Sequence, residues 1–325
     1  MDFVILWVDN SDLQWIESYN KYSTLHGGIK KDIYYRDWDI LKYWFRGVEK
    51  YSPWVDKIHF ITCGHYPKWL NLNAKKLNFV RHEDFIPSEY LPTFNAFSIE
   101  LNIHRIEGLS EEFVYFNDDF FIINKVDENR FFRKGKPCDM AIMNALSGGG
   151  ISHTTLSGIE VLNKHFNKKD VLKSNIYDFF NLRYGINLFR SIMLLSWPRF
   201  TGFLDHHLPQ PFLKSIFHEV WDKEYERLDN TCRSKFRELD NVNQYLLRYW
   251  QFCTHGFTPY NIQNDSCMYG IYSESIDAIV DIIKHRKKSI IVLNDTDLCN
   301  NFDFCKKKII ESFEQIFPDK SSYEL

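Results

Sequence analysis

The chain has 325 residues, of which 44% are hydrophobic and 26% are charged, and this balance is typical of a globular protein with one large α/β domain or two small ones. The formal net charge of −3 argues against nucleic acid or an acidic membrane as a partner of the molecule as a whole. Any anionic ligand therefore has to be held by a local cluster. Aromatic residues reach 17%, which predicts large cores and rings that can stack on sugars.

The cysteines and the apolar runs bear on the compartment. There are seven cysteines, an odd number, and no two of them have CxxC spacing, so we expect reduced thiols. No apolar run approaches the roughly 20 residues that a membrane span needs. The sequence therefore predicts a cytoplasmic protein, either free or at the inner face of the membrane.

The first 144 residues alternate between short apolar runs and segments with helical spacing of apolar positions. Expected strands cover residues 3–8, 57–62, 77–82, 113–116 and 138–144, and expected helices cover 36–51 and 95–106. This βαβ alternation predicts an α/β fold with a mostly parallel sheet covered by helices.

The second half is expected to be more helical. Helices are predicted within 155–200 and at 228–250, 275–285 and 304–317, and a late strand is predicted at 289–293. A glycine-rich break at 147–150 divides the expected single domain 1–325 into an N-terminal α/β part (1–146), a helical insertion (147–200) and a C-terminal part (201–325). The lysine-flanked tail helix is expected either to touch a membrane or to pack in the core or a dimer.

Three apolar strands each end in acidic residues, in "FVILWVDNSD", "FVYFNDD" and "SIIVLNDTD". Ligands of open α/β sheets bind beyond the carboxyl ends of the strands, and carboxylates gathered there suit a divalent cation and phosphate. The alternative is that these are ordinary turn residues. Three such ends in one chain, one of them with the pair Asp118-Asp119, favour a ligand site.

Further candidates lie in the C-terminal part. His206 and His207 precede Pro209 and Pro211 in a stiff extended segment, which suits a general base, although a structural loop histidine is the alternative. Lys214 follows, and Arg237 is expected on a helix from which it can fork onto a phosphate or stay solvated.

Two residue groups of the N-terminal part complete the candidates. Arg36 opens the helix expected at 36–51 and is its candidate functional cation. Glu100 and His104 have i, i+4 spacing, which predicts a hydrogen-bonded pair rather than a metal site. The chain has no P-loop, no GxGxxG after the first strand and no GxSxG elbow.

Taken together, these motifs resemble the Stealth family of sugar-phosphate transferases. The resemblance covers nearly the whole chain in four regions. They are residues 2–12, the long block that starts at "RDWDILKYWFRGVEK" and runs through "LPTFNAFSIELNIHRIEGLSEEFVYFNDDFFI", the stretch from "HHLPQPFLK" through "SKFRELDNVNQYLLRYW", and "SIIVLNDTD".

The resemblance implies a reaction and a fold. In that family an acceptor sugar hydroxyl attacks the β-phosphorus of a UDP-sugar, UMP leaves, and the whole sugar-1-phosphate is transferred to form a phosphodiester. The implied fold is a GT-A-like nucleotide-sugar domain with additional helices. The implied cofactor is Mg²⁺ or Mn²⁺, and the implied partners are a UDP-sugar donor and a growing glycan or lipid-linked acceptor.

The resemblance also assigns roles to matching positions. It implies catalytic roles for His207 as the base, Arg237 as a phosphate clamp, and Asp119 and Asp9; metal binding by Asp118, Asp119 and Asp295; and donor binding by Asp12 and Asn294. We further expect donor binding by Arg36, Asn95, Asn117 and Lys214. Two positions depart from the family pattern: Asn10 stands where Gly is common, and Asn95 stands where Ser is usual.

Two rival functions stay open at this point. An ordinary glycosyltransferase with the same donor would release UDP, and a glycan-binding or assembly protein would have no activity. The sequence also leaves open the donor sugar, the acceptor, the oligomeric state, the choice between Asp118 and Asp119 as the direct ligand, and the choice between His206 and His207 as the base.

Overall fold

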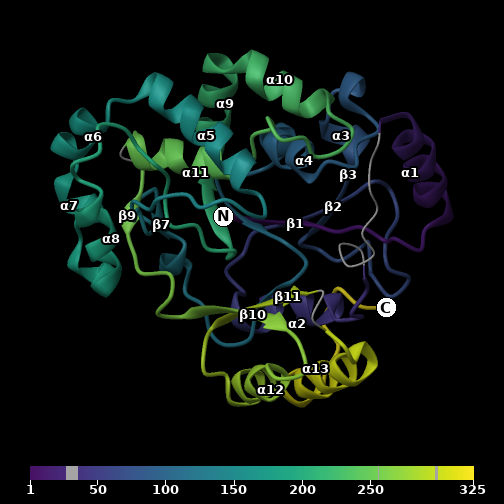
Figure 1. The fold of residues 1–325 in the computed structure, drawn as a ribbon. Coiled ribbons are helices and arrows are strands. Elements are labelled where there is room, and N and C mark those ends of the chain that lie inside the picture. The colour runs from purple at the N-terminus through teal and green to yellow at the C-terminus, as the bar shows by residue number, and fades with distance from the viewer. Residues whose placement is uncertain (27–35, 255, 297–298) are drawn as a thin grey trace.

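The computed structural model describes residues 1–26, 36–254, 256–296 and 299–325. Its central sheet has the strand order β3-β2-β1-β4-β8. Figure 1 labels the first three of these strands, β3, β2 and β1. The first four of these strands are parallel, and β8 is an antiparallel edge strand. The expected α/β class with a mostly parallel central sheet is confirmed. The strands are β1 (Asp2–Leu6), β2 (Ile58–Thr62), β3 (Leu77–Arg81), β4 (Glu112–Phe116) and β8 (Gln210–Leu213).

Two smaller sheets flank the central one. The order β10-β11-β5 forms one, and β6-β7-β9 forms the other. The strand expected at 138–144 was wrong in extent and placement, because β7 ends at Asp139 and pairs with β6 and β9 instead of with the central sheet. The strands are β5 (Phe120–Ile122), β10 (Ser266–Ile271), β11 (Ile290–Asp295), β6 (Phe132–Arg133), β7 (Lys136–Asp139) and β9 (Thr258–Pro259).

Helices cover both faces of the central sheet. The α-helices are α1 (Leu13–His26), α2 (Leu41–Tyr51), α3 (His82–Phe85), α4 (Ala96–Asn102), α5 (Ser152–His165), α6 (Lys168–Ser174), α7 (Ile176–Phe179), α8 (Leu188–Met193), α9 (Lys214–Lys223), α10 (Tyr225–Arg233), α11 (Gln244–Cys253), α12 (Ile276–His285) and α13 (Phe302–Ile316). Short 3₁₀ helices are η2 (Ser88–Tyr90), η3 (Ile103–Arg105), η4 (Glu128–Arg130) and η5 (Leu182–Asn187).

The strands of the central sheet bury side chains on both faces, as their continuous apolar runs predict. Phe3 and Phe116 point into a core formed with α2, the second sheet, α12 and α13. Val4 and Tyr115 point into a core formed with α4, α9, α10 and α11. In Figure 1 the second of these helix groups lies above the central sheet, and α12 and α13 lie below it.

Two expected helices were wrong in extent. The helix expected from Arg36 begins only at Leu41, because Asp39 has a φ of 55° and its N–H donates to Asp37 Oδ1 at 2.8 Å. The helix expected at 228–250 is split into α10 and α11. Asn243 caps α11 by accepting from the N–H of Tyr245 at 3.2 Å, so the intervening residues form a loop.

The amphipathic tail helix α13 packs in the core. Of the two alternatives expected for it, membrane contact or packing, the structure shows packing. Ile309, Phe313 and Ile316 are buried, and the Phe313 ring stacks on Tyr43 with 5.1 Å between the ring centroids. Its apolar face is therefore not available to a membrane. No helix within the described ranges has the length and apolarity to span a bilayer. The seven cysteines, all of them described, are free thiols, as expected.

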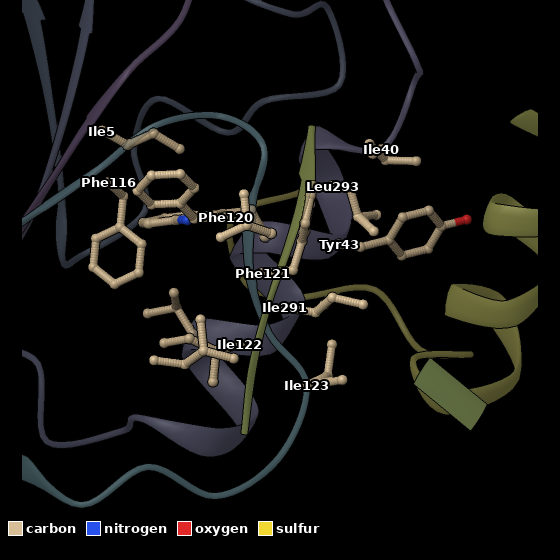
Figure 2. Packing of buried hydrophobic residues seen from close by; sticks show 14 of the residues in the cluster. Ile5, Ile40, Tyr43, Phe116, Phe120, Phe121, Ile122, Ile123, Ile291 and Leu293 are labelled. Atoms are coloured by element: carbon tan, nitrogen blue, oxygen red, sulfur yellow. The ribbon is translucent and has the colours of Figure 1, made fainter. Parts of the chain in front are cut away.

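Strand β5 connects the central sheet to the second sheet. It follows β4 after only three residues, yet it pairs antiparallel with β11 in the second sheet. Figure 2 shows Phe120 on the side of Ile5 and Phe116, whereas Phe121 lies on the side of Tyr43. The turn 117–119 is thus held from both sides by packed strands.

Helix α2 packs closely against β5 at Gly47. A Cβ atom at this position would lie 2.2 Å from the carbonyl oxygen of Ile122, whereas one at Gly158 in α5 would meet Leu246 Cβ at an ordinary 3.6 Å. Glycine at position 47 therefore lets the helix approach the strand that follows the acidic turn.

We expect Gly47→Ala to lower the free energy of unfolding by about 1–3 kcal/mol, because the added methyl group collides with backbone. The matched variant Gly158→Ala is expected to change it by less than about 1 kcal/mol, since the site has room and alanine favours the helix. Equilibrium urea unfolding measures both. Equal effects of the two substitutions would contradict the close α2–β5 contact.

Candidate active site

A cavity of about 970 Å³ opens where β1, β4 and β11 end. Its polar wall includes Asp9 after β1, residues 117–119 after β4, and Asn294 and Asp295 at the end of β11. The three acidic strand ends that were expected to meet therefore line one cavity. They do not meet at one edge of a single parallel sheet, however, because β11 belongs to the second sheet.

The turn 117–119 is fixed by hydrogen bonds at both ends. The N–H of Phe120 donates to Asn117 O at 3.2 Å, and the N–H of Leu293 donates to Asp119 O at 2.9 Å. The hydroxyl of Tyr115 also donates to Asn117 Oδ1 at 2.6 Å. The positions of Asp118 and Asp119 are consequently set by the two sheets and not by a free loop.

His207 stands directly beside this turn. Its Nε2 lies 3.1 Å from Asp119 Oδ2, and its ring meets the ring of Phe120 edge-on, with 4.7 Å between centroids. Burial lowers the pKa of His207, but the hydrogen bond and negative charge of Asp119 outweigh it, so the pKa is raised. The side chain is 35% exposed, which leaves the ring reachable from solvent.

The fold explains why His207 reaches Asp119. Strand β8 runs antiparallel to β4 and its first residue, Gln210, pairs with Tyr115, so the residues before β8 lie beside the turn that follows β4. Asp205 anchors this segment by accepting from Arg248 Nη1 of α11 at 2.7 Å and from the Tyr249 hydroxyl. The neighbouring His206 side chain does not hydrogen-bond to Asp119, and burial lowers the pKa of His206 to about 4.

The surroundings of Asp118 disfavour the negatively charged form of its carboxyl group. The side chain is exposed toward the cavity, but the concave walls remove much of its bulk water. The pKa of Asp118 is raised to about 7, mainly by this desolvation and secondly by the negative charge of Asp119. A bound cation would relieve this local negative potential.

Asp295 is engaged by two residues from the segment before α2. Arg36 Nε donates to Asp295 Oδ2 at 2.8 Å, its Nη2 donates to Oδ1, and Trp38 Nε1 donates to Oδ2 at 3.0 Å. The carboxylate thus positions the Arg36 guanidinium at the cavity wall. Its role as a metal ligand stays a prediction.

Arg237 lies at the cavity in the loop between α10 and α11, so its expected place on a helix was wrong. Its guanidinium lies 4.8 Å from the centroid of the Phe97 ring. Asn95 fastens this loop, since its Nδ2 donates to Asn241 Oδ1 at 2.9 Å and to Ser234 O at 3.3 Å. Asn95 is fully buried, so it supports the site instead of lining the cavity.

Asp12 and Lys214 were expected to bind the donor, and neither is among the cavity-lining residues. Asp12 Oδ1 accepts from the N–H of Trp15 at 2.7 Å and stabilises the start of α1. Lys214 follows β8 at the far end of β4, where its N–H donates to Glu111 O. Asp9 does line the cavity, and its Oδ1 accepts from both N–H and Oγ of Ser11.

Glu100 was missed as a site residue by sequence reasoning. It lines the cavity, and its Oε1 accepts from the hydroxyl of Tyr115 at 3.0 Å, so the expected pair with His104 was wrong. Helix α4 ends at Asn102, and His104 lies in η3 with its ring near Phe217. Burial raises the pKa of Glu100 to about 7, although Arg237 opposes this shift. One signal in the sequence could have indicated this contact. Side chains of a strand alternate between its two faces, so Tyr115 points to the face opposite to that of Val114 and Phe116.

The residues present fit an Mg²⁺ ion that keeps several water ligands better than an ion enclosed by protein side chains alone. Within the described ranges no group of three or more His, Cys, Asp or Glu side chains is arranged to hold a metal. Mg²⁺ commonly takes one or two carboxylates and completes its shell with water and phosphate oxygens. Asp118, which is exposed at the cavity, and the adjacent Asp119 match that requirement.

Comparisons with known proteins show which family the chain belongs to. The chain matches the family model of Stealth protein CR2, conserved region 2, over residues 34–139. A galactosyltransferase LgtC structure, in complex with donor and acceptor sugar analogs, aligns over 96% of both chains with 11% identity and a TM-score of 0.41. A TM-score this low carries no argument about fold or function.

Relatives match over the whole chain. It is 41% identical to a capsular polysaccharide phosphotransferase WcwK of Streptococcus pneumoniae, 37% identical to the exopolysaccharide phosphotransferase cps2G of Lactiplantibacillus plantarum, and 36% identical to the receptor polysaccharide phosphotransferase WefC of Streptococcus gordonii. These matches cover 100% of this chain and 98%, 96% and 99% of the relatives. The chain therefore belongs to the Stealth family.

Proposed function

We propose that this protein transfers a sugar-1-phosphate from a UDP-sugar to a hydroxyl group of a glycan acceptor and releases UMP. The observation that carries the proposal is the single cavity that gathers Asp118, Asp119, Arg36 and Arg237, with His207 hydrogen-bonded to Asp119. Its volume of about 970 Å³ suits a ligand as large as a nucleotide-sugar. The names of the relatives, all polysaccharide phosphotransferases, support the same chemistry.

In the proposed step, the acceptor oxygen forms a bond to the β-phosphorus. The bond between this phosphorus and the oxygen bridging to the α-phosphate breaks, and UMP leaves with that oxygen. His207 takes the proton of the acceptor hydroxyl. Because a carboxylate only accepts, the contact of Asp119 with Nε2 keeps a proton there and leaves Nδ1 as the basic atom.

Positive groups at the cavity offset the charge of the phosphoryl group. Arg237 lies on its loop beside Phe97, and Arg36 is oriented by Asp295. Preorganised cations of this kind stabilise charge that develops in a transition state. Glu100, which lines the cavity and accepts from the Tyr115 hydroxyl, would form a hydrogen bond with a sugar hydroxyl.

Asp118 and Asp119 would hold the divalent ion, Mg²⁺ or Mn²⁺. When bound, such an ion neutralises the pyrophosphate and aids departure of the nucleotide. The growing glycan or a lipid-linked intermediate would be the acceptor, with the reaction on the cytoplasmic side of the membrane.

The identity of the released nucleotide tests the proposal. A panel of UDP-sugars is incubated with the full chain, Mg²⁺ and a glycan acceptor, and nucleotides are separated by chromatography. UMP is expected, because the attacked atom is the β-phosphorus. Release of UDP would instead establish an ordinary glycosyltransferase, and no release with any donor would favour a glycan-binding protein.

His207→Gln is expected to lower kcat by about a hundred-fold or more, since a positioned general base contributes about 10²–10⁴-fold. The matched control is His206→Gln, because His206 neighbours it but does not contact the acidic turn; this variant should keep kcat within about three-fold. UMP release measures both, and thermal unfolding checks that each variant is folded. Equal losses in the two variants would rule out the specific role of His207.

Removal of divalent ions with EDTA is expected to stop UMP release, and added Mg²⁺ should restore it. Asp118→Asn should lower kcat/KM by about a hundred-fold or more, because the carboxylate charge that holds the ion is lost. Asp222→Asn, on the exposed side of α9, is the control and should have no effect. Full activity of Asp118→Asn in limiting Mg²⁺ would overturn the assignment.

A further inference from the structure

Large apolar side chains are exposed together on the segment that carries α7, η5 and α8. Leu182 is 88% exposed and Ile186 is 91% exposed. Isolated exposed apolar residues are ordinary, but a concentration of them in one segment marks an interaction site. The α7–α8 surface is defined here as Ile176, Tyr177, Leu182, Ile186, Phe189, Ile192, Met193, Leu195 and Trp197, each more than 40% exposed.

Buried side chains and hydrogen bonds hold this segment against the rest of the protein, so the exposure of its apolar side chains follows from the fold. Phe179 and Tyr184 are buried, and the Tyr184 hydroxyl donates to Asp178 O at 2.8 Å. The N–H of Met143 donates to Ser191 Oγ at 3.0 Å. Lys168, which is itself buried, donates through Nζ to Leu194 O and to Trp197 O at 2.8 Å.

Helix α8 shows how the residues divide. Ser191 points inward and is fully buried, whereas Phe189, Ile192 and Met193 have i, i+3 and i+4 spacing and share the outward face. In Figure 1, α6, α7 and α8 lie together at one edge of the molecule, far from α12 and α13.

The same segment is basic. Residues 168–199 contain six Lys or Arg against two Asp, in a chain whose formal net charge is −3. Five of these cations are exposed alongside the apolar side chains: Lys169, Lys173, Arg183, Arg190 and Arg199. Apolar and aromatic residues interleaved with Lys and Arg are typical of surfaces that lie in the headgroup region of anionic membranes.

We propose that the α7–α8 surface docks on an anionic lipid bilayer. Phe189, Met193 and Trp197 would enter the boundary between headgroups and acyl chains, and the arginines would contact lipid phosphates. The contact is peripheral, in keeping with the described helices, none of which can span a membrane. This inference goes beyond the proposed function and does not depend on it.

Charge favours a bilayer over a second copy of the chain. In a twofold dimer the same patch of both chains is used, so the five exposed cations of each chain would be gathered in one interface. An anionic bilayer instead offers the opposite charge across the whole surface. The proposed membrane-contacting surface is not the tail helix, which was the candidate from sequence, because α13 buries its apolar face in the core.

Sedimentation with vesicles tests the proposal on the full chain. Wild-type protein should bind phosphatidylcholine vesicles that contain about 30% phosphatidylglycerol and should bind pure phosphatidylcholine vesicles at least about ten-fold more weakly. The variant Leu182→Ser/Ile186→Ser/Phe189→Ser should lose about ten-fold or more of its binding, because apolar insertion is removed. Arg183→Gln/Arg199→Gln should lose about ten-fold, and high salt should mimic it.

The control is Tyr225→Ser/Met268→Ser, which removes two apolar side chains exposed by 56% and 50% outside the surface. It should bind anionic vesicles like the wild type. Thermal unfolding and far-UV circular dichroism check that the variants fold, and light scattering reports their oligomeric state. The proposal is overturned if the wild-type protein does not bind anionic vesicles, or if the triple variant binds them as well as the wild type. It is also overturned if the only effect of the triple substitution is to dissociate a dimer.

Discussion

The crossing from β4 to β5 is the constraint on which the site depends. These two strands are separated by three residues but belong to different sheets, so the turn 117–119 is stretched between two ladders of hydrogen bonds. On one side β8 places His207 against Asp119, and on the other β11 ends in Asp295. Apolar packing of Phe116, Phe120 and Phe121 on both sides of the turn fixes two carboxylates where an isolated loop could not hold them.

Charges around the cavity are paired unevenly. Asp295 is neutralised by Arg36, and Asp119 is balanced in part by His207, whereas desolvation and the charge of Asp119 raise the pKa of Asp118. In the proposed function, the ligand that would balance these charges brings both a cation and phosphate oxygens. The geometry therefore explains why an acidic turn and basic side chains occur in the same cavity.

Much of the fold was predictable because apolar runs and their periodicity reflect local burial. The parallel strands β1 to β4 and the late strand β11 lie close to the expected residues. The errors came from hydrogen bonds of single side chains, some to neighbouring backbone and some to partners distant in sequence. Asp39 ends the helical pattern through a local turn, and Asn95 and Asn241 hold open the loop that carries Arg237, although its sequence has helical spacing. Likewise, α13 has the pattern of a membrane-surface helix, but Phe313 packs on Tyr43.

The sequence by itself determined the α/β class, the acidic strand ends and the candidates Asp118, Asp119 and His207, because strand periodicity and residue chemistry are local properties. Only the tertiary structure decided that His207 and not His206 meets Asp119, that Glu100 lines the cavity and accepts from Tyr115, and that Asp12 and Lys214 are not among the cavity-lining residues. It also decided which apolar segment stays exposed. Those outcomes depend on which strands become neighbours, and strand pairing is set by packing between segments far apart in the chain.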